Sequence, residues 1–271
     1  MLFVCPKCKR KLANIPDNRA ICELGHSFDR AKEGYYNLLL GSNGGVHGDN
    51  KEMVLARREF LCSGAYAPLA ERLSDTVIKY AAKDSVILDA GCGEGYYTDA
   101  VEKRLCESGV DASVIGFDIS RDAVRYAAKK NRSLSLVVAS SYDMPIADGS
   151  VDILINVFSP LAIDETSRVL RSGGKFVMAI PDENHLFGLK SVLYERPYKN
   201  TVADSALDGF KLLSEEKISY ALTLDSTEKI RSLFMMTPYA YRTPKSAGER
   251  LLTMQSLTTE IEFILFTYER I

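Results

Sequence analysis

Short apolar runs alternate with helix-like segments between residues 85 and 181, and this pattern constrains the fold more than any other feature. Five runs have the length and the β-branched residues of buried strands: "SVILDAG", "ASVIGFDIS", "LSLVVAS", "VDILINVF" and "KFVMAIP". Three segments between them have helical spacing: "YYTDAVEKRLCES", "RDAVRYAAKKN" and "AIDETSRVLRSGG". Because parallel strands need a crossover connection, usually a helix, this order predicts an α/β fold with a Rossmann-like parallel sheet covered on both faces.

The segments on either side of this alternation are patterned too. Two helices are predicted before it, over "KEMVLARREFL" and "YAPLAERLSDTVIKYAAK". After Pro181, two strands are predicted at the ends of a helical stretch, over "GFKLLSEEKISYALTL" and "SLTTEIEFILFTYER". We expect the last run to join the sheet, because Ile261 and Phe263 alternate with Glu260 and Glu262.

A glycine-rich loop follows the first strand, in "LDAGCGEGYYT". Gly91, Gly93 and Gly95 let the backbone turn sharply and approach a ligand, and the next helix presents its N-terminus to that ligand. The spacing is not that of a dinucleotide-binding loop, whose third glycine comes one residue later. Asp89 opens the loop, and a carboxylate repels a pyrophosphate but attracts an ammonium group. The loop therefore favours S-adenosylmethionine, which carries an ammonium and a sulfonium and no phosphate.

Two further strand ends support this cofactor. Asp118 ends the second strand, 23 residues after Gly95, where an acid can accept hydrogen bonds from both ribose hydroxyls. The third strand ends in Ser140, Ser141 and Asp143, where we expect the adenine. NAD is the alternative ligand, and capping of the following helix is the alternative role for Asp118.

The start of the chain holds four potential metal ligands. Cys5 and Cys8 form a C-x-x-C turn, and Cys22 and His26 follow after 13 residues, a gap that fits a hairpin of "KLANI" and "AIC". Thiolates and imidazole are the ligands that Zn²⁺ prefers, and four protein ligands leave no open position, so the predicted zinc is structural. A redox C-x-x-C would need a βαβ context that is absent, and coincidental cysteines are the remaining alternative.

Charge and hydropathy indicate the kind of binding partner and the cellular location of the protein. Residues 1–34 contain seven Lys or Arg and four Asp or Glu, a net +3 in a chain of net charge −2. A basic head suits contact with a polyanion, and a solvated surface is the alternative. The apolar runs are too short to span a membrane, and the start lacks the apolar segment of a secretory signal. We therefore expect a cytoplasmic protein without membrane contact.

The sequence resembles the 23S rRNA (guanine-N1-)-methyltransferases of the RlmA type. The most specific matching stretches are "GHSFDRAKEGYYNLL" and "GDNKEMVLARREFL". Others are "LDAGCGEGYYT", "VASSYDMPIADGSVD", "DENHLFGLKSVLYE" and "MMTPYAYR", so the resemblance spans nearly the whole chain. It implies a zinc-binding RNA-recognition module over residues 1–40, a linker ("GSNGGVHGDN") and helix over 41–60, and an S-adenosylmethionine-dependent methyltransferase domain over 61–271.

The resemblance also implies roles for individual residues. It implies that Cys5, Cys8, Cys22 and His26 bind zinc, and that the cofactor is contacted by Tyr66, by the loop residues Gly93, Glu94, Gly95 and Tyr96, and by His185. It implies a homodimer whose zinc modules help to form an RNA cleft. From the residues alone, Tyr66 is as well explained as a core residue, and His185 as a surface residue beyond the fifth strand.

The predicted reaction is transfer of a methyl group to N1 of a guanine in a 23S rRNA hairpin. The catalytic residues stay unassigned, because Asn156, Ser159 and Pro160 lie where substrate should approach but form no known catalytic set. Tyr96, Tyr97 or Phe158 are candidates to stack on the base. Two alternatives stand beside this function: a small-molecule methyltransferase with a zinc module that serves oligomerisation, and a non-enzymatic zinc protein with a degenerate nucleotide fold.

Overall fold

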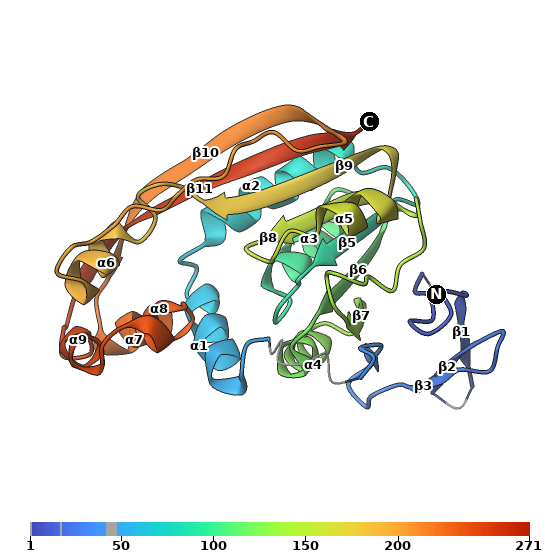
Figure 1. The fold of residues 1–271 in the computed structure, drawn as a ribbon, viewed down its shortest axis with the longest axis horizontal. Helices are drawn as coiled ribbons and strands as arrows, with labels where there is room; N and C mark the ends of the chain where they lie inside the picture. The colour runs from blue at the N-terminus through green and yellow to red at the C-terminus, as the bar shows by residue number, and fades with distance from the viewer. Residues whose placement is uncertain (1, 17, 42–47) are drawn as a thin grey trace.

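An eight-stranded sheet organises the computed structural model, which describes residues 2–16, 18–41 and 48–271 (Figure 1). The strands lie in the order β10 (Phe210–Leu224), β11 (Leu257–Arg270), β9 (Leu170–Pro181), β8 (Val151–Val157), β5 (Val86–Ala90), β6 (Ser113–Asp118), β7 (Ser135–Val138) and β4 (Tyr36–Asn37). The six strands from β9 to β4 are parallel, whereas β11 is antiparallel to both of its neighbours. The predicted Rossmann-like α/β fold is confirmed.

The sheet is buried on both faces, and successive strand residues point to opposite faces. On one face, Ile87 and Ile153 belong to a core shared with α2 (Ala67–Tyr80), α3 (Tyr96–Glu107) and α4 (Arg121–Lys130). On the other face, Leu88 and Leu154 belong to a second core shared with α5 (Ile163–Val169) and with the N-terminal head. This burial explains why the strands are continuous apolar runs.

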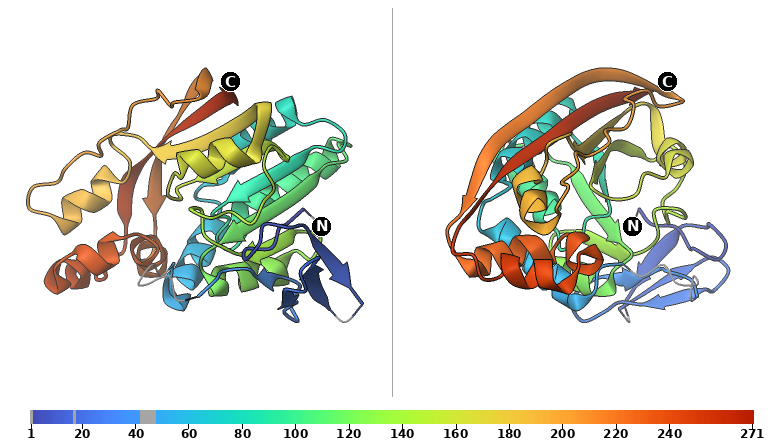
Figure 2. Two further views of the ribbon diagram at one scale, coloured as in Figure 1. Left: turned by 45° about the vertical axis from the view of Figure 1, so that its right-hand side comes forward. Right: turned by 60° about the vertical axis from the view of Figure 1, so that its left-hand side comes forward.

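The N-terminal head is a small antiparallel sheet packed on this second face. The predicted hairpin is confirmed as β1 (Leu12–Ile15) and β2 (Arg19–Cys22), and a third strand, β3 (Ser27–Asp29), pairs with β2. Figure 2 shows the head, in dark blue, beside the β7 edge of the large sheet. Residues 42–47 of the predicted linker lie outside the described residues, and the boundary predicted at residue 40 stays a prediction.

The C-terminal half adds a long hairpin and a group of short helices. Strands β10 and β11 are paired along their whole length, and the connection between them forms α7 (Thr227–Met235), α8 (Tyr239–Arg242) and α9 (Lys245–Leu251). Helix α6 (Phe187–Leu193) follows β9, and α1 (Lys51–Cys62) packs against α7. Figure 1 shows α6 to α9 together at the end of the hairpin, on the opposite side of α1 from the head.

One predicted element has a different boundary. The helix expected over residues 162–174 ends at Val169, because the chain from Leu170 already pairs with β8. No helix in the described part of the chain is long and apolar enough to cross a membrane.

Candidate active site and metal centre

The glycine loop has the geometry of an open cradle at the carboxyl end of β5. Gly91, Gly93 and Gly95 have φ of 88°, 55° and 82°, the left-handed region that favours glycine. A Cβ atom on Gly91 would meet Ser159, and one on Gly95 would meet Ala127, but nothing lies within 4 Å of the corresponding point at Gly93. The loop is therefore packed at its two ends and open in the middle, where a ligand can approach the backbone.

Asp118 is tied to this loop by backbone hydrogen bonds. Its Oδ2 accepts from the Gly93 N–H at 3.0 Å, and its Oδ1 accepts from the Ser120 N–H at 2.7 Å. Burial raises the pKa of Asp118, and these two hydrogen bonds oppose the rise. Each carboxylate oxygen keeps lone-pair capacity, so Asp118 can still accept hydrogen bonds from a pair of ribose hydroxyls.

Asp89 lies beneath the loop and is 2% exposed. Its Oδ2 accepts a hydrogen bond from Thr98 Oγ1 at 2.6 Å. Burial raises the pKa of Asp89 from 3.8 to about 7, with the Thr98 hydrogen bond opposing the rise and the negative charge of Asp118 adding to it. A nearby cation such as an ammonium group would favour the ionised form.

Glu94 and Tyr97 leave buried polar atoms for a ligand. Within the described ranges, Glu94 Oε1 and the Tyr97 hydroxyl are buried and have no hydrogen-bond partner. Burial raises the pKa of Glu94, and the positive charges of Lys130 and Arg57 oppose the rise. Three carboxyl groups around one loop, of which Asp89 and Glu94 are buried and Asp118 is half-buried, disfavour an anionic ligand and fit the cationic S-adenosylmethionine.

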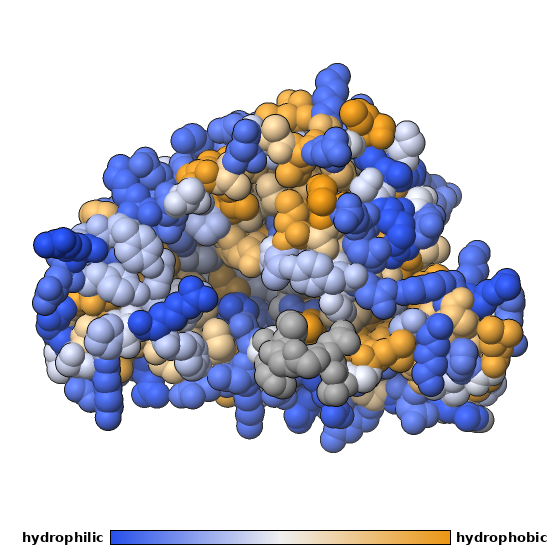
Figure 3. All heavy atoms as spheres, in the orientation of Figure 1, coloured by the Kyte–Doolittle hydropathy of each residue, from blue (hydrophilic) through white to orange (hydrophobic). Residues whose placement is uncertain are grey.

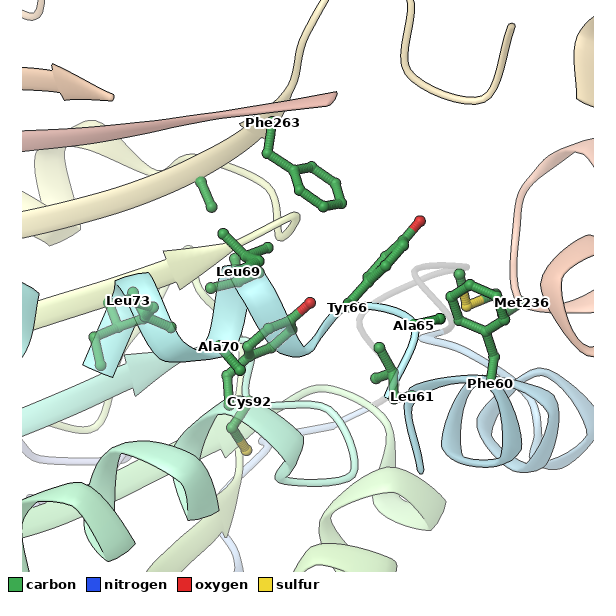
Figure 4. Close-up of a cluster of buried hydrophobic side chains, with 14 of the residues drawn as sticks. Phe60, Leu61, Ala65, Tyr66, Leu69, Ala70, Leu73, Cys92, Met236 and Phe263 are labelled. Carbon is green, nitrogen blue, oxygen red and sulfur yellow. The ribbon is translucent and has the colours of Figure 1, made fainter. Parts of the chain in front are cut away.

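Tyr66 and His185 form a buried pair beside the loop. The His185 Nδ1 atom accepts a hydrogen bond from the Glu262 N–H at 3.2 Å, so the ring proton is on Nε2, which donates to the Tyr66 hydroxyl at 3.2 Å. Burial lowers the pKa of His185 to about 3 and raises that of Tyr66. The imidazole is therefore neutral, and the Tyr66 hydroxyl keeps its own hydrogen to donate to a ligand. In Figure 4 this hydroxyl points out of the cluster, between Phe60 and Phe263.

The remaining predicted cofactor residues are at the rim. Ser141 is half-buried in the loop after β7, which also places Asp143 opposite Ser140. Tyr96 begins α3, and its ring lies 5.0 Å from that of Tyr97, with Lys130 Nζ 5.8 Å from its centroid. The roles of these residues toward the cofactor stay predictions.

The end of β8 faces the same opening and offers a ring but no base. Phe158 has φ of 60° and is 42% exposed, and its ring lies 5.1 Å from that of Phe263. Ser159 Oγ donates to the Ala90 carbonyl at 2.6 Å, so it anchors the strand end to the glycine loop. Asn156 is buried. These residues can position a substrate, but none of them is a strong proton acceptor.

The four predicted metal ligands come together in the head. The ligand atoms of Cys5, Cys8, Cys22 and His26 all lie within 4.8 Å of one another. Cys8 Sγ is 3.6 Å from Cys22 Sγ, and His26 Nδ1 is 3.5 Å from the sulfurs of Cys5 and Cys22. A tetrahedral Zn²⁺ with ordinary bond lengths separates its ligand atoms by roughly 3.5–3.8 Å. The donor set therefore fits a structural zinc.

Two residues near the cofactor loop were not identified from the sequence. Thr98, which donates a hydrogen bond to Asp89, is fully buried in the first turn of α3. Its place in the first turn of the helix after the glycine loop is the one feature of the sequence that could have indicated this role. Arg57 on α1 forms an ion pair with Asp49 and donates to the Met236 carbonyl at 3.3 Å. Met236 is 179 residues away in the sequence, and no sequence pattern shows that the two segments meet.

Known proteins support the same assignments. A family model described as "Methyltransferase domain" matches residues 81–232, and one described as "RlmA, N-terminal", a zinc ribbon, matches residues 3–40. Together with the acidic glycine loop and the Cys/His cluster, these matches define an S-adenosylmethionine-dependent methyltransferase with a structural zinc ribbon. The NAD alternative is thereby set aside.

The relatives narrow this class to one family. A 23S rRNA (guanine(748)-N(1))-methyltransferase of Streptomyces fradiae is 32% identical, over 97% of this chain and 94% of the relative. Two proteins provisionally named as 23S rRNA (guanine-N(1)-)-methyltransferases are similar as well. The one from Bacillus subtilis strain 168 is 30% identical, over 97% of this chain and 96% of its own. The one from Micromonospora griseorubida is 33% identical, over 88% and 86%. The chain belongs to the family of 23S rRNA (guanine-N1)-methyltransferases.

Proposed function

We propose that the chain transfers the methyl group of S-adenosylmethionine to N1 of a guanine in a hairpin of 23S rRNA. One observation carries this proposal: the similarity to the Streptomyces fradiae enzyme spans 97% of the chain, zinc ribbon and methyltransferase domain together. A small-molecule methyltransferase is disfavoured, because it gives no account of why the ribbon and the domain occur together in rRNA methyltransferases.

The residues of the site divide between holding the cofactor and placing the base. S-adenosylmethionine supplies an electrophilic methyl group on its sulfonium. Asp89 and Glu94 offer carboxylates to a cationic group, Asp118 offers acceptors to ribose hydroxyls, and Tyr66 offers a hydroxyl donor. We further propose that Gly91, Gly93, Gly95, Tyr96, Ser141 and His185 line this site, and that Cys5, Cys8, Cys22 and His26 hold the zinc.

The chemistry requires an unpaired guanine, because N1 lies inside a Watson–Crick pair. The N1 proton must leave, yet His185 is a poor base, since both ring nitrogens are engaged and its pKa is about 3. We therefore propose that the protein works chiefly by orientation, which can supply of the order of 7–11 kcal/mol. The exposed ring of Phe158 at the end of β8 provides a surface for the base. We also propose that the protein is cytoplasmic, as its apolar runs and its start indicate. We propose that it acts as a homodimer, as the resemblance implies.

Reverse transcription tests the proposal directly. Unmodified 23S rRNA is incubated with the protein and cofactor and then copied, and an N1 methyl group should stop the copy at one guanine. The Asp89→Asn variant should lose the stop while its zinc content stays at one ion per chain. Full extension with the unaltered protein, under conditions where it binds the cofactor, would refute the proposed substrate.

A further inference from the structure

A surface beside the C-terminal helices contains none of the residues that we assign to the cofactor. It consists of residues 194–200, after α6, and residues 239–245, from α8 to the start of α9, and is called the Tyr/Arg surface below. Because β9 and β10 are both antiparallel to β11, they run in the same direction. The segments that follow them therefore emerge at the same edge of the sheet as the glycine loop. Asn200 Nδ2 donates to the Asp182 carbonyl at 2.8 Å, which ties the surface to the segment that carries His185.

The composition of the Tyr/Arg surface is unlike that of the rest of the chain. It holds four tyrosines and four basic residues against a single acid, Glu195, whereas the whole chain has a net charge of −2. Lys199 pairs with Glu183 at 3.2 Å. Arg196 and Arg242 are exposed, and neither forms an ion pair with any residue of the described ranges. Basic groups without partners beside aromatic rings are typical of a surface for single-stranded nucleic acid.

The exposed rings are held in place from beneath. Tyr198 is 51% exposed, and its ring lies 5.5 Å from that of Tyr194 and 4.7 Å from Lys190 Nζ. Lys190 is fully buried and donates to the Tyr198 carbonyl at 3.2 Å and to Asn200 Oδ1 at 2.6 Å. Tyr241 is 53% exposed, and its hydroxyl accepts from Asn50 Nδ2 at 3.3 Å. Rings that are already fixed lose little conformational entropy when a base stacks on them.

We propose that the Tyr/Arg surface binds unpaired nucleotides of the RNA substrate, with bases stacked on Tyr198 and Tyr241 and phosphates paired with Arg196 and Arg242. This inference rests on the proposed function. The zinc ribbon, with its own net +3 over residues 1–34, lies on the far side of the glycine loop (Figure 1). Figure 3 shows the molecule hollowed between the C-terminal helices and the rest of the body. RNA held on both sides of this hollow would place an extruded guanine over the methyl-transfer site.

A protein partner fits the surface less well. The core of a protein interface is depleted in charge, whereas this surface carries four basic residues and one acid, and the segments expose no aliphatic side chain longer than alanine apart from prolines. Instead, each of the two segments combines two tyrosines with two basic residues.

Fluorescence anisotropy tests this proposal. It measures the binding of a labelled 23S rRNA hairpin fragment in the presence of S-adenosylhomocysteine. Tyr198→Ala should weaken RNA binding about 5- to 100-fold, since stacking on one aromatic residue accounts for roughly that range. Tyr198→Phe keeps the ring and should stay within about twofold of the unaltered protein. Arg196→Glu should also weaken binding, and more so at low salt. Lys83→Glu, a matched charge reversal before β5 at the opposite edge of the sheet, should have no such effect.

The outcomes separate this inference from the proposed function. Affinity for S-adenosylhomocysteine and the melting temperature should be the same in all five proteins, which excludes misfolding as the cause. Unchanged RNA affinity in both Tyr198→Ala and Arg196→Glu would overturn the inference, as would dissociation of an oligomer by these variants without loss of RNA affinity. If the unaltered protein binds the fragment but leaves no methyl group on it, the proposed function fails. The RNA affinities of the variants still show in that case whether the Tyr/Arg surface binds RNA.

Discussion

At the scale of single residues, we expect Asp89 to couple cofactor binding to pH. Its pKa of about 7 in the ligand-free protein means that the carboxyl group is largely protonated at pH 6 and largely ionised at pH 8. The ammonium group of the cofactor, which S-adenosylhomocysteine keeps, interacts better with the ionised form. We expect the affinity for S-adenosylhomocysteine, measured by calorimetry, to fall about tenfold from pH 8 to pH 6, which is the linkage expected for one such group. Asp89→Asn should bind at least about tenfold more weakly at pH 8. It should also lack this pH dependence.

The same substitution should stabilise the ligand-free protein. The folded-state pKa of Asp89 lies above the unfolded value of 3.8, so stability falls as the pH rises from about 4 to 7 and the buried group ionises. Asparagine removes this cost and can still accept the hydrogen bond from Thr98. The melting temperature at pH 8 should therefore rise while affinity falls. Asp118→Asn is the control, because it removes a neighbouring negative charge that raises the pKa of Asp89 and should therefore keep the pH dependence but move it to lower pH. An Asp89→Asn variant that kept the full pH dependence would contradict this account.

At the scale of elements, the glycine loop depends on close packing against the end of β8. Gly91 has φ of 88°, and a Cβ atom there would lie 2.3 Å from Ser159 Cβ. Gly109 also has positive φ, 68°, but a Cβ atom there would meet nothing within 4 Å. Gly109→Ala should therefore lower the free energy of unfolding only by the cost of an alanine in the left-handed region, about 1–2 kcal/mol. Gly91→Ala should lower it by roughly 1–3 kcal/mol more, because the added methyl group overpacks the site. Urea unfolding of the two variants measures the difference, and equal losses would show that Ser159 gives way without cost.

Most elements were predictable because their patterns are local. A buried parallel strand is a short apolar run bounded by glycine or polar residues, so the runs that became β5, β6, β7 and β8 were identified from the sequence. The beginning of β9 was not. Its pairing jumps from Leu170 opposite Val151 to Lys175 opposite Ile153, and this irregularity depends on the neighbouring strand. Strand β4 has two residues, too few to carry any periodicity.

In the candidate site, too, some features could be predicted from the sequence and others could not. Asp89 and Asp118 could be identified because they are the last residue but one of β5 and the last residue of β6, and therefore lie at a known edge of the sheet. The tautomer of His185 could not, because it is fixed by a backbone group 77 residues away, the Glu262 N–H. Nor could the aromatic setting of Lys190, whose contacts Tyr198 and Tyr239 come from two separate segments. Sequence patterns thus identify residues placed by a single element, and folding brings the others together.

At the scale of the whole molecule, the zinc ribbon is part of the core rather than an appended arm. Phe3, Leu12 and Cys22 belong to the same buried cluster as Phe117 and Val137 of the large sheet. The ribbon also contacts the loop after β7, where adenine is expected. Here the Val4 N–H donates to the Pro145 carbonyl at 2.8 Å, and Lys9 forms an ion pair with Asp143. The fold of the ribbon therefore supports one face of the sheet and one wall of the proposed cofactor site.

Loss of zinc should consequently destabilise the entire chain and weaken cofactor binding. We expect Cys8→Ser to unfold in one cooperative transition, with a melting temperature lower by about 10 °C or more, which corresponds to a loss of roughly 3–5 kcal/mol for a chain of this size. Its affinity for S-adenosylhomocysteine at 15 °C, where the variant is still folded, should fall several-fold. Cys62→Ser is the matched control, since Cys62 is exposed and lies outside the metal cluster. The alternative is that the ribbon of Cys8→Ser unfolds separately. Calorimetry would then show a small transition at lower temperature, and the main transition and the cofactor affinity would be unchanged. That result would mean that the shared core contributes little and that the ribbon folds as an independent unit.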